Sequence, residues 1–180
     1  DRFANIRLLA VGPLDVAEAP PRSASIEVRS LPGGALAQQA DVHRSDPDAW
    51  THHAGPEADG DDLKLAAFLD TVCRGLTSNA VAIGHRTANG SLALAGGGAG
   101  QMDRVASCRI AVEKAGDRAR GGAAASDACF PFSDGPELLL EAGVTMIVHP
   151  GGSKRDGETF AVCAAAGVGC WTTGIRRFRH

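Results

Sequence analysis

The sequence predicts an α/β domain with parallel strands. Its 180 residues and 44% hydrophobic content suit one compact core. The 23 glycines and the lack of tyrosine favour a core of small side chains that pack at close range. In the second half of the chain, short apolar runs alternate with helical patterns. This alternation predicts parallel strands joined by right-handed helical crossovers.

The amino-terminal part consists of short extended segments. The apolar run at residues 6–11 ends at a Gly-Pro pair and predicts a buried strand. Apolar and polar residues alternate at 26–31, which predicts another strand. The Pro-Gly-Gly turn at 32–34 then leads into a second extended piece at 35–38.

Residues 41–62 break this pattern. They are rich in Asp, His, Pro and Gly, and they predict an irregular excursion or linker. His52 and His53 lie in this acidic stretch, where solvated side chains are the expected state. We therefore assign them no role.

A helix and a hairpin follow. Asp61 or Asp62 can cap a helix whose apolar residues fall three or four positions apart, namely Leu65, Leu69, Val72 and Leu76. An Asn-Gly turn at 89–90 then joins the apolar runs 80–83 and 91–95, which predicts a β-hairpin.

The glycine-rich segment 96–100 leads into a predicted helix that reaches about residue 114. Glycines let the backbone approach a ligand, and the start of a helix offers unpaired N–H groups to an anion. The segment lacks the spacing of the known phosphate-binding loops, and a plain flexible turn would look the same. Both interpretations remain open at this point.

The last third of the chain alternates regularly. Its predicted elements are a short strand ending at 127, a helix at 136–142, a strand at 144–148, a helix at 158–166 and a strand through 171. Ligands bind beyond the carboxyl ends of the strands in such sheets. We therefore expect the loops 127–134, 149–153 and 172–180 to share one rim.

Charge and cysteine content exclude several classes of protein. The net charge is −3 and no basic stripe alternates with aromatics, which argues against nucleic-acid binding. No apolar run is long enough to span a membrane, and the first residues do not resemble a signal peptide, so we expect a soluble cytoplasmic protein. The five cysteines form no Cys-x-x-Cys pair, which argues against a disulfide framework and against a zinc site.

Four ordered blocks carry a resemblance to a known family. They read Ser-Asn-Ala-Val at 78–81, Gly-Ala-Gly-Gln-Met-Asp-Arg-Val at 98–105, Ala-Ser-Asp-Ala-Cys-Phe-Pro-Phe-Ser-Asp at 125–134 and Pro-Gly-Gly-Ser-Lys-Arg-Asp at 150–156. The chain ends on Thr-Gly-Ile-Arg-Arg-Phe-Arg-His. Together these segments resemble 5-aminoimidazole-4-carboxamide ribonucleotide (AICAR) formyltransferase, the transformylase of purine biosynthesis.

The resemblance implies a fold and a reaction. The fold is a cytidine-deaminase-like three-layer sandwich with a mixed, mostly parallel sheet. The reaction transfers a formyl group, without metal, from 10-formyltetrahydrofolate to the 5-amino group of AICAR. The whole chain, 1–180, resembles the second transformylase subdomain, so the first subdomain and the fused cyclohydrolase domain are expected to be absent.

The resemblance also implies roles for particular residues. Three positions match catalytic residues: Asn79, Asp134 and His180. Three match positions that bind the nucleotide, with an arginine on its phosphate: Asn79, Arg104 and Arg176. Four match the folate pocket: Val105, Phe130, Pro131 and Asp134.

Each of these residues has a plainer interpretation. Asn79 can simply end a helix, and Arg104 can be a solvated helix residue. Asp134 suits any helix start because of the macrodipole. Phe130 would ordinarily be a core residue, and the segment 176–180 an exposed basic tail.

The family also uses a Lys-His pair, and this sequence contains no Lys-His dipeptide. Attack by a weakly nucleophilic amine needs a base and oxyanion support. We therefore expect a half-site, completed in a homodimer or by a partner chain that supplies the missing half. Two alternatives remain open: a non-catalytic nucleotide-binding or regulatory module, and a formyltransferase for another amine, which the departures at Cys129 and Ser133 would permit.

Overall fold

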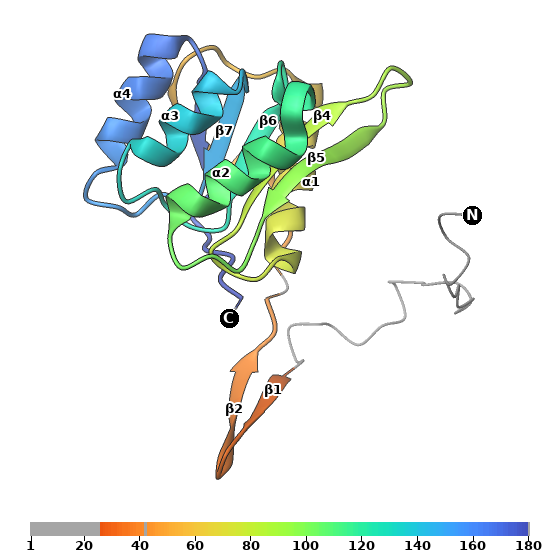
Figure 1. Cartoon of the computed structure of the whole chain (residues 1–180), viewed down its shortest axis with the longest axis vertical. Coiled ribbons are helices and arrows are strands. Elements are labelled where there is room, and N and C mark those ends of the chain that lie inside the picture. The colour runs from red at the N-terminus through yellow and green to blue at the C-terminus, as the bar shows by residue number, and fades with distance from the viewer. Residues whose placement is uncertain (1–25, 42, 180) are drawn as a thin grey trace. The chain divides into compact units, whose positions relative to one another are not determined.

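The computed structural model describes residues 26–41 and 43–179 (Figure 1). The strand predicted at 6–11 and the terminal residue His180 lie outside the described residues. The chain divides into two compact units, Asp1–Val42 and His43–His180.

The described part of the first unit is a hairpin. β1 (Ile26–Leu31) pairs antiparallel with β2 (Gly34–Gln39), and Leu31 lies opposite Gly34. Gly33 takes a positive φ of 83° at the turn, a conformation that favours glycine. The strand, turn and second extended piece predicted here are confirmed.

The second unit is built on a six-stranded mixed sheet with the order β3-β8-β7-β6-β4-β5. The strands are β3 (Thr51–Ala54), β4 (Val81–Arg86), β5 (Leu92–Gly98), β6 (Ala123–Ser126), β7 (Met146–His149) and β8 (Gly169–Thr172). Only the neighbouring pairs β6–β7 and β7–β8 are parallel, so the expectation of a mostly parallel sheet is wrong. The reason is that β4 runs opposite to both β5 and β6, and β3 opposite to β8.

Helices cover both faces of this sheet and make three layers (Figure 1). They are α1 (Gly60–Gly75), α2 (Arg104–Ala115), α3 (Asp134–Glu141) and α4 (Asp156–Ala166). On one face, Leu65 and Leu69 of α1 pack against the sheet. On the other, Cys108 of α2, Leu139 of α3 and Cys163 of α4 share a second apolar cluster.

The start of α1 is set by Asp59, not by Asp61 or Asp62 as predicted. The Asp59 carboxylate accepts hydrogen bonds from the backbone N–H groups of Asp61 at 2.9 Å and Asp62 at 2.8 Å. Asp61 and Asp62 therefore lie inside the first turn, where acidic side chains interact favourably with the helix dipole.

We expect Asp59→Ala to lower the free energy of unfolding by about 1 kcal/mol, because it leaves these backbone groups without a cap. Asp59→Ser is the matched control, since a serine side chain can still accept from the same N–H groups. Urea denaturation of the three proteins measures the effect. Equal stability of the alanine and serine variants would contradict the assignment of the cap.

The segment 41–62, predicted to be irregular, contains the edge strand β3. It pairs with β8 through Thr51 opposite Thr172 and His52 opposite Trp171. His53 stacks on Phe160 of α4 with ring centroids 4.1 Å apart. The expectation of an irregular segment is thus wrong, because the excursion carries a strand. The expectation of solvated histidines agrees with the structure, in which the His52 and His53 side chains are exposed.

The first part of the glycine-rich segment belongs to β5, and its residues Gly96 and Gly98 face α2. A Cβ added at Gly96 would lie 2.1 Å from the carbonyl oxygen of Ala111. A Cβ at Gly98 would lie 2.0 Å from the carbonyl oxygen of Ser107. Gly96 and Gly98 thus form neither a ligand-binding loop nor a flexible turn. They belong to a strand, and their lack of a side chain lets the backbone of α2 approach that strand.

Candidate functional site

The candidate site lies at the edge of the sheet where the parallel strands end. Val81 pairs with both Gly98 and Ser126, which brings the start of β4 and the ends of β5 and β6 to this edge. Parallel pairing places His149 and Thr172, the last residues of β7 and β8, side by side. The loops predicted to share one rim therefore do so over their described residues.

A buried carboxylate organises this edge. Asp127 is fully buried, and its carboxylate pairs with the guanidinium of Arg104, which is 6% exposed. The Ser78 hydroxyl donates to the same carboxylate at 2.5 Å. The pair thus links the residues before β4, the first residue of α2 and the residue after β6.

Asn79 lies directly beside this ion pair. Its side-chain Nδ2 donates to the carbonyl oxygen of Gln101 at 2.9 Å, and its Oδ1 accepts from Arg104 at 2.8 Å. The Arg104 guanidinium also donates to the carbonyl oxygen of Ala80. Arg104 is therefore engaged with the protein itself, while Asn79 keeps one N–H and one lone pair for a ligand.

The carboxyl-terminal segment is fastened to the same edge. Ser78 and Arg179 exchange two hydrogen bonds, at 2.8 and 2.9 Å, and the backbone N–H of Arg177 donates to the Asp127 carbonyl oxygen at 2.8 Å. The Arg177 side chain forms a buried ion pair with Asp70 of α1 at 2.8 Å. Sequence analysis missed this pair because Asp70 lies outside the predicted apolar face of the helix. The buried face of α1 also includes Ala66, Asp70 and Cys73.

Arg176, by contrast, is exposed. Its guanidinium lies 3.5 Å from the position that a Cβ of Gly152 would take, so it sits against the loop that follows β7. The backbone N–H groups of Gly152 and Ser153 donate to the Asp156 carboxylate at 2.6 and 3.1 Å. These two loop amides are therefore occupied, whereas the exposed Arg176 guanidinium is open to an anion.

His149 is buried at the end of β7. Its Nδ1 accepts from the backbone N–H of Gly151 at 3.1 Å, and its ring meets Phe130 edge-on at 5.4 Å. Burial lowers the pKa of His149 to about 4, partly opposed by the nearby Asp156 carboxylate. The imidazole is therefore neutral at pH 7, and its lowered pKa makes it a weak base. Its hydrogen bond from Gly151 holds the start of the loop.

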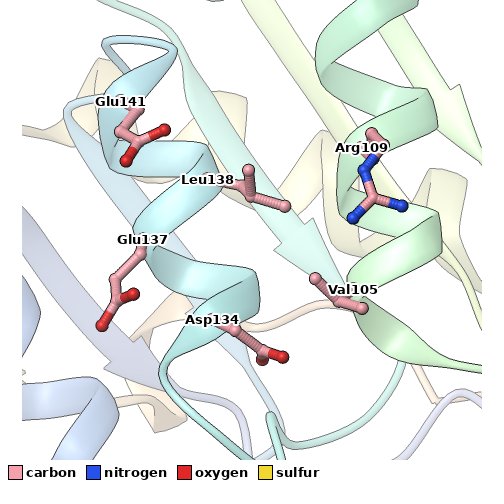
Figure 2. Close-up of a pocket in the computed structure, with 6 residues that line it drawn as sticks. All are labelled: Val105, Arg109, Asp134, Glu137, Leu138 and Glu141. Carbon is pink, nitrogen blue, oxygen red and sulfur yellow. The ribbon is translucent and has the colours of Figure 1, made fainter.

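A pocket of about 360 Å³ lies between α2 and α3 (Figure 2). Its lining comprises Val105, Arg109, Asp134, Glu137, Leu138 and Glu141. Two residues predicted for a folate pocket, Val105 and Asp134, thus meet in one cavity. Of the other two, Pro131 is exposed nearby, whereas Phe130 is 1% exposed and packs in the core.

Across residues 26–41 and 43–179, no three His, Cys, Asp or Glu side chains are grouped so that they could hold a metal ion. Over the same residues, no helix has the length and apolar character required to cross a membrane.

Comparisons with known proteins bear on the whole chain. The profile of the AICARFT/IMPCHase bienzyme family matches residues 2–114. The bifunctional purine biosynthesis protein PurH of Cutibacterium acnes is 45% identical over 183 residues, which cover 99% of this chain and 33% of the relative. PurH of Mycobacterium leprae is also 45% identical, over 98% of this chain and 32% of the relative.

A solved structure, Acinetobacter baumannii RibD, matches with a TM-score of 0.42 and 18% sequence identity, over 63% of this chain and 35% of that one. This likeness is too distant to support a conclusion. The chain spans about a third of the length of the two PurH relatives.

Fold and site together define a three-layer α/β protein with a polar site, built from loops, at the carboxyl ends of its parallel strands. The family match and the identity to two PurH proteins specify it further. The chain belongs to the AICARFT/IMPCHase bienzyme family.

Proposed function

We propose that this chain provides half of a formyl-transfer site, which uses 10-formyltetrahydrofolate to formylate the 5-amino group of AICAR. The observation that carries the proposal is the convergence of the family-like segments at one edge of the sheet. In this proposal the chain is the second transformylase subdomain, with the cytidine-deaminase-like form of the three-layer fold.

Each ligand has a proposed place at this edge. The nucleotide lies beside Asn79, whose amide contacts the carboxamide and amine region, with its phosphate on Arg176. Arg104 acts by holding Asn79 through the hydrogen bond to its side chain. The folate lies in the α2–α3 pocket against Val105 and Asp134, near Pro131 and with Phe130 supporting the wall from the core. For His180, which lies outside the described residues, the resemblance implies a role beside the reacting centre.

In this proposal the base that the chemistry requires comes from the missing half of the site. The attacking amine must lose a proton, and His149, the most buried histidine of this edge, has a pKa lowered to about 4 by burial. Exposed apolar side chains nearby indicate where a further part of the site would pack. Met102, Phe132 and Phe178 are 100%, 52% and 47% exposed, and all three lie on segments at the strand-end edge.

We expect Arg176→Ala to weaken AICAR binding about 10- to 100-fold, because a hydrogen bond to a charged group contributes about 1.5–3 kcal/mol. Titration calorimetry with the purified chain measures the loss. Arg120→Ala is the matched control, because Arg120 is 74% exposed and lies away from the strand-end edge. Unchanged affinity in Arg176→Ala would remove the phosphate role from this residue.

The half-site itself is tested by turnover. We expect the purified chain to bind AICAR and a formylfolate but to transfer little formyl group, and a PurH-like segment carrying the Lys-His pair to restore transfer. Robust turnover by this chain alone would overturn the half-site. If the chain binds AICAR but no folate, the result would instead favour the non-catalytic nucleotide-binding module. The hydrogen bonds that Arg104 and Asn79 form within the protein also fit that alternative.

A further inference from the structure

We infer that Arg109 determines the pteridine specificity of the α2–α3 pocket, by selecting a ring with an oxo group at carbon 4 over one with an amino group there. The inference rests on the proposed function, because it takes a folate as the ligand. It assigns a specificity-determining role to a residue that none of the family-like blocks contains.

The pocket presents opposite charges from its two walls. Asp134 at the first turn of α3 points toward α2, and Arg109 on α2 also lines the pocket (Figure 2). Within residues 43–179, the Arg109 guanidinium forms no hydrogen bond or ion pair, whereas its backbone belongs to the helix α2. Asp134 accepts one hydrogen bond, at 2.8 Å, from the backbone N–H of Gly135. Both groups therefore remain available to a ligand.

Apolar side chains separate the two charges. Val105 of α2 and Leu138 of α3 project into the same space (Figure 2). A flat ring can lie between such side chains with its polar edge exposed to the charged groups. Glu137 points away from α2, which leaves Asp134 as the carboxylate facing Val105 (Figure 2).

The polar edge of a pteridine matches this arrangement only in its 4-oxo form. That form presents two donors, the 2-amino group and the N3–H, followed by the acceptor O4. A carboxylate can only accept hydrogen bonds and a guanidinium can only donate them. Asp134 thus suits the donors and Arg109 suits O4.

A 4-amino ring reverses the last part of this pattern. Its N3 is an acceptor and its 4-amino group is a donor, so a donor would face the Arg109 guanidinium. Leaving these polar groups without partners where the bound ring covers them costs enough to weaken binding about 10- to 100-fold. The same donor and acceptor logic predicts that the selectivity depends on Arg109.

The test compares two ligands and three proteins. The chain is titrated with tetrahydrofolate and with its 4-amino counterpart, and amide chemical shifts report binding. We expect the chain to favour tetrahydrofolate by at least about tenfold, and Arg109→Met to reduce that preference to about threefold or less. Arg120→Met, which changes an exposed arginine that does not line the pocket, should keep the full preference.

The outcomes separate the inference from the proposed function. Binding of tetrahydrofolate with no preference over the 4-amino form, or with a preference that survives in Arg109→Met, overturns the inference and leaves the proposed function standing. Binding of neither ligand up to its solubility limit overturns the folate part of the proposed function, and the inference with it. Urea denaturation of Arg109→Met confirms that the exposed substitution leaves the fold intact.

Discussion

Replacing Asp127 with asparagine is expected to destabilise the second unit by about 3–5 kcal/mol. Asp127 is fully buried and Arg104 is 6% exposed, so the substitution leaves a buried guanidinium without its counter-charge. It also replaces the acceptor of the Ser78 hydroxyl with an amide. Urea denaturation followed by the fluorescence of Trp171, which is 7% exposed in β8, reports the unfolding of this unit.

An exposed ion pair provides the control. Arg155 and Glu158 lie 2.8 Å apart with side chains 50% and 45% exposed, so Glu158→Gln should change stability by no more than about 1 kcal/mol. A loss of less than about 1 kcal/mol in Asp127→Asn would show that the buried pair does not hold this edge together. The double variant Arg104→Met, Asp127→Leu should lose less than Asp127→Asn, because it removes both buried charges.

The fold of the last third was largely predictable from local patterns. The helix expected at 158–166 is α4, Asp156–Ala166, and the strand expected at 144–148 is β7, Met146–His149. Glycine and proline mark the ends of these segments, and apolar periodicity marks their type. Such signals lie within each segment, so one sequence is sufficient to read them.

Features that depend on distant residues were missed. β3 is short and mostly exposed, and what makes it a strand is its pairing with β8, more than a hundred residues away. The buried pairs Arg104–Asp127 and Asp70–Arg177 likewise join separate elements. No local pattern specifies these partners, because tertiary packing selects them.

The candidate site, too, was predictable only in part. Its position followed from the rule that ligands bind at the carboxyl ends of parallel strands. The particular residues Asn79, Val105 and Asp134 came from resemblance to a family. Arg109 came from neither source, because its place opposite Asp134 depends on how α2 packs beside α3.

The glycine-rich segment gives the second large prediction. We expect Gly98→Ala to destabilise the second unit by about 3 kcal/mol. This loss is at or above the upper end of the range that an extra methyl group in a packed core usually costs. Its new Cβ would lie 2.0 Å from the Ser107 carbonyl oxygen and 2.9 Å from the Ser107 Cα, so α2 must move away from β5. Urea denaturation measures this loss.

The adjacent Gly97→Ala is the control, because it adds the same methyl group to the same strand on the opposite face. Its Cβ would meet only a side-chain atom of Leu76, at 3.7 Å, which is ordinary van der Waals contact. This variant should be neutral or more stable by up to about 1 kcal/mol, because alanine restricts the unfolded chain. Equal stability of the two variants would contradict close packing as the reason for Gly98. A ligand-binding role for the glycine run predicts a different result, in which Gly98→Ala weakens binding at unchanged stability.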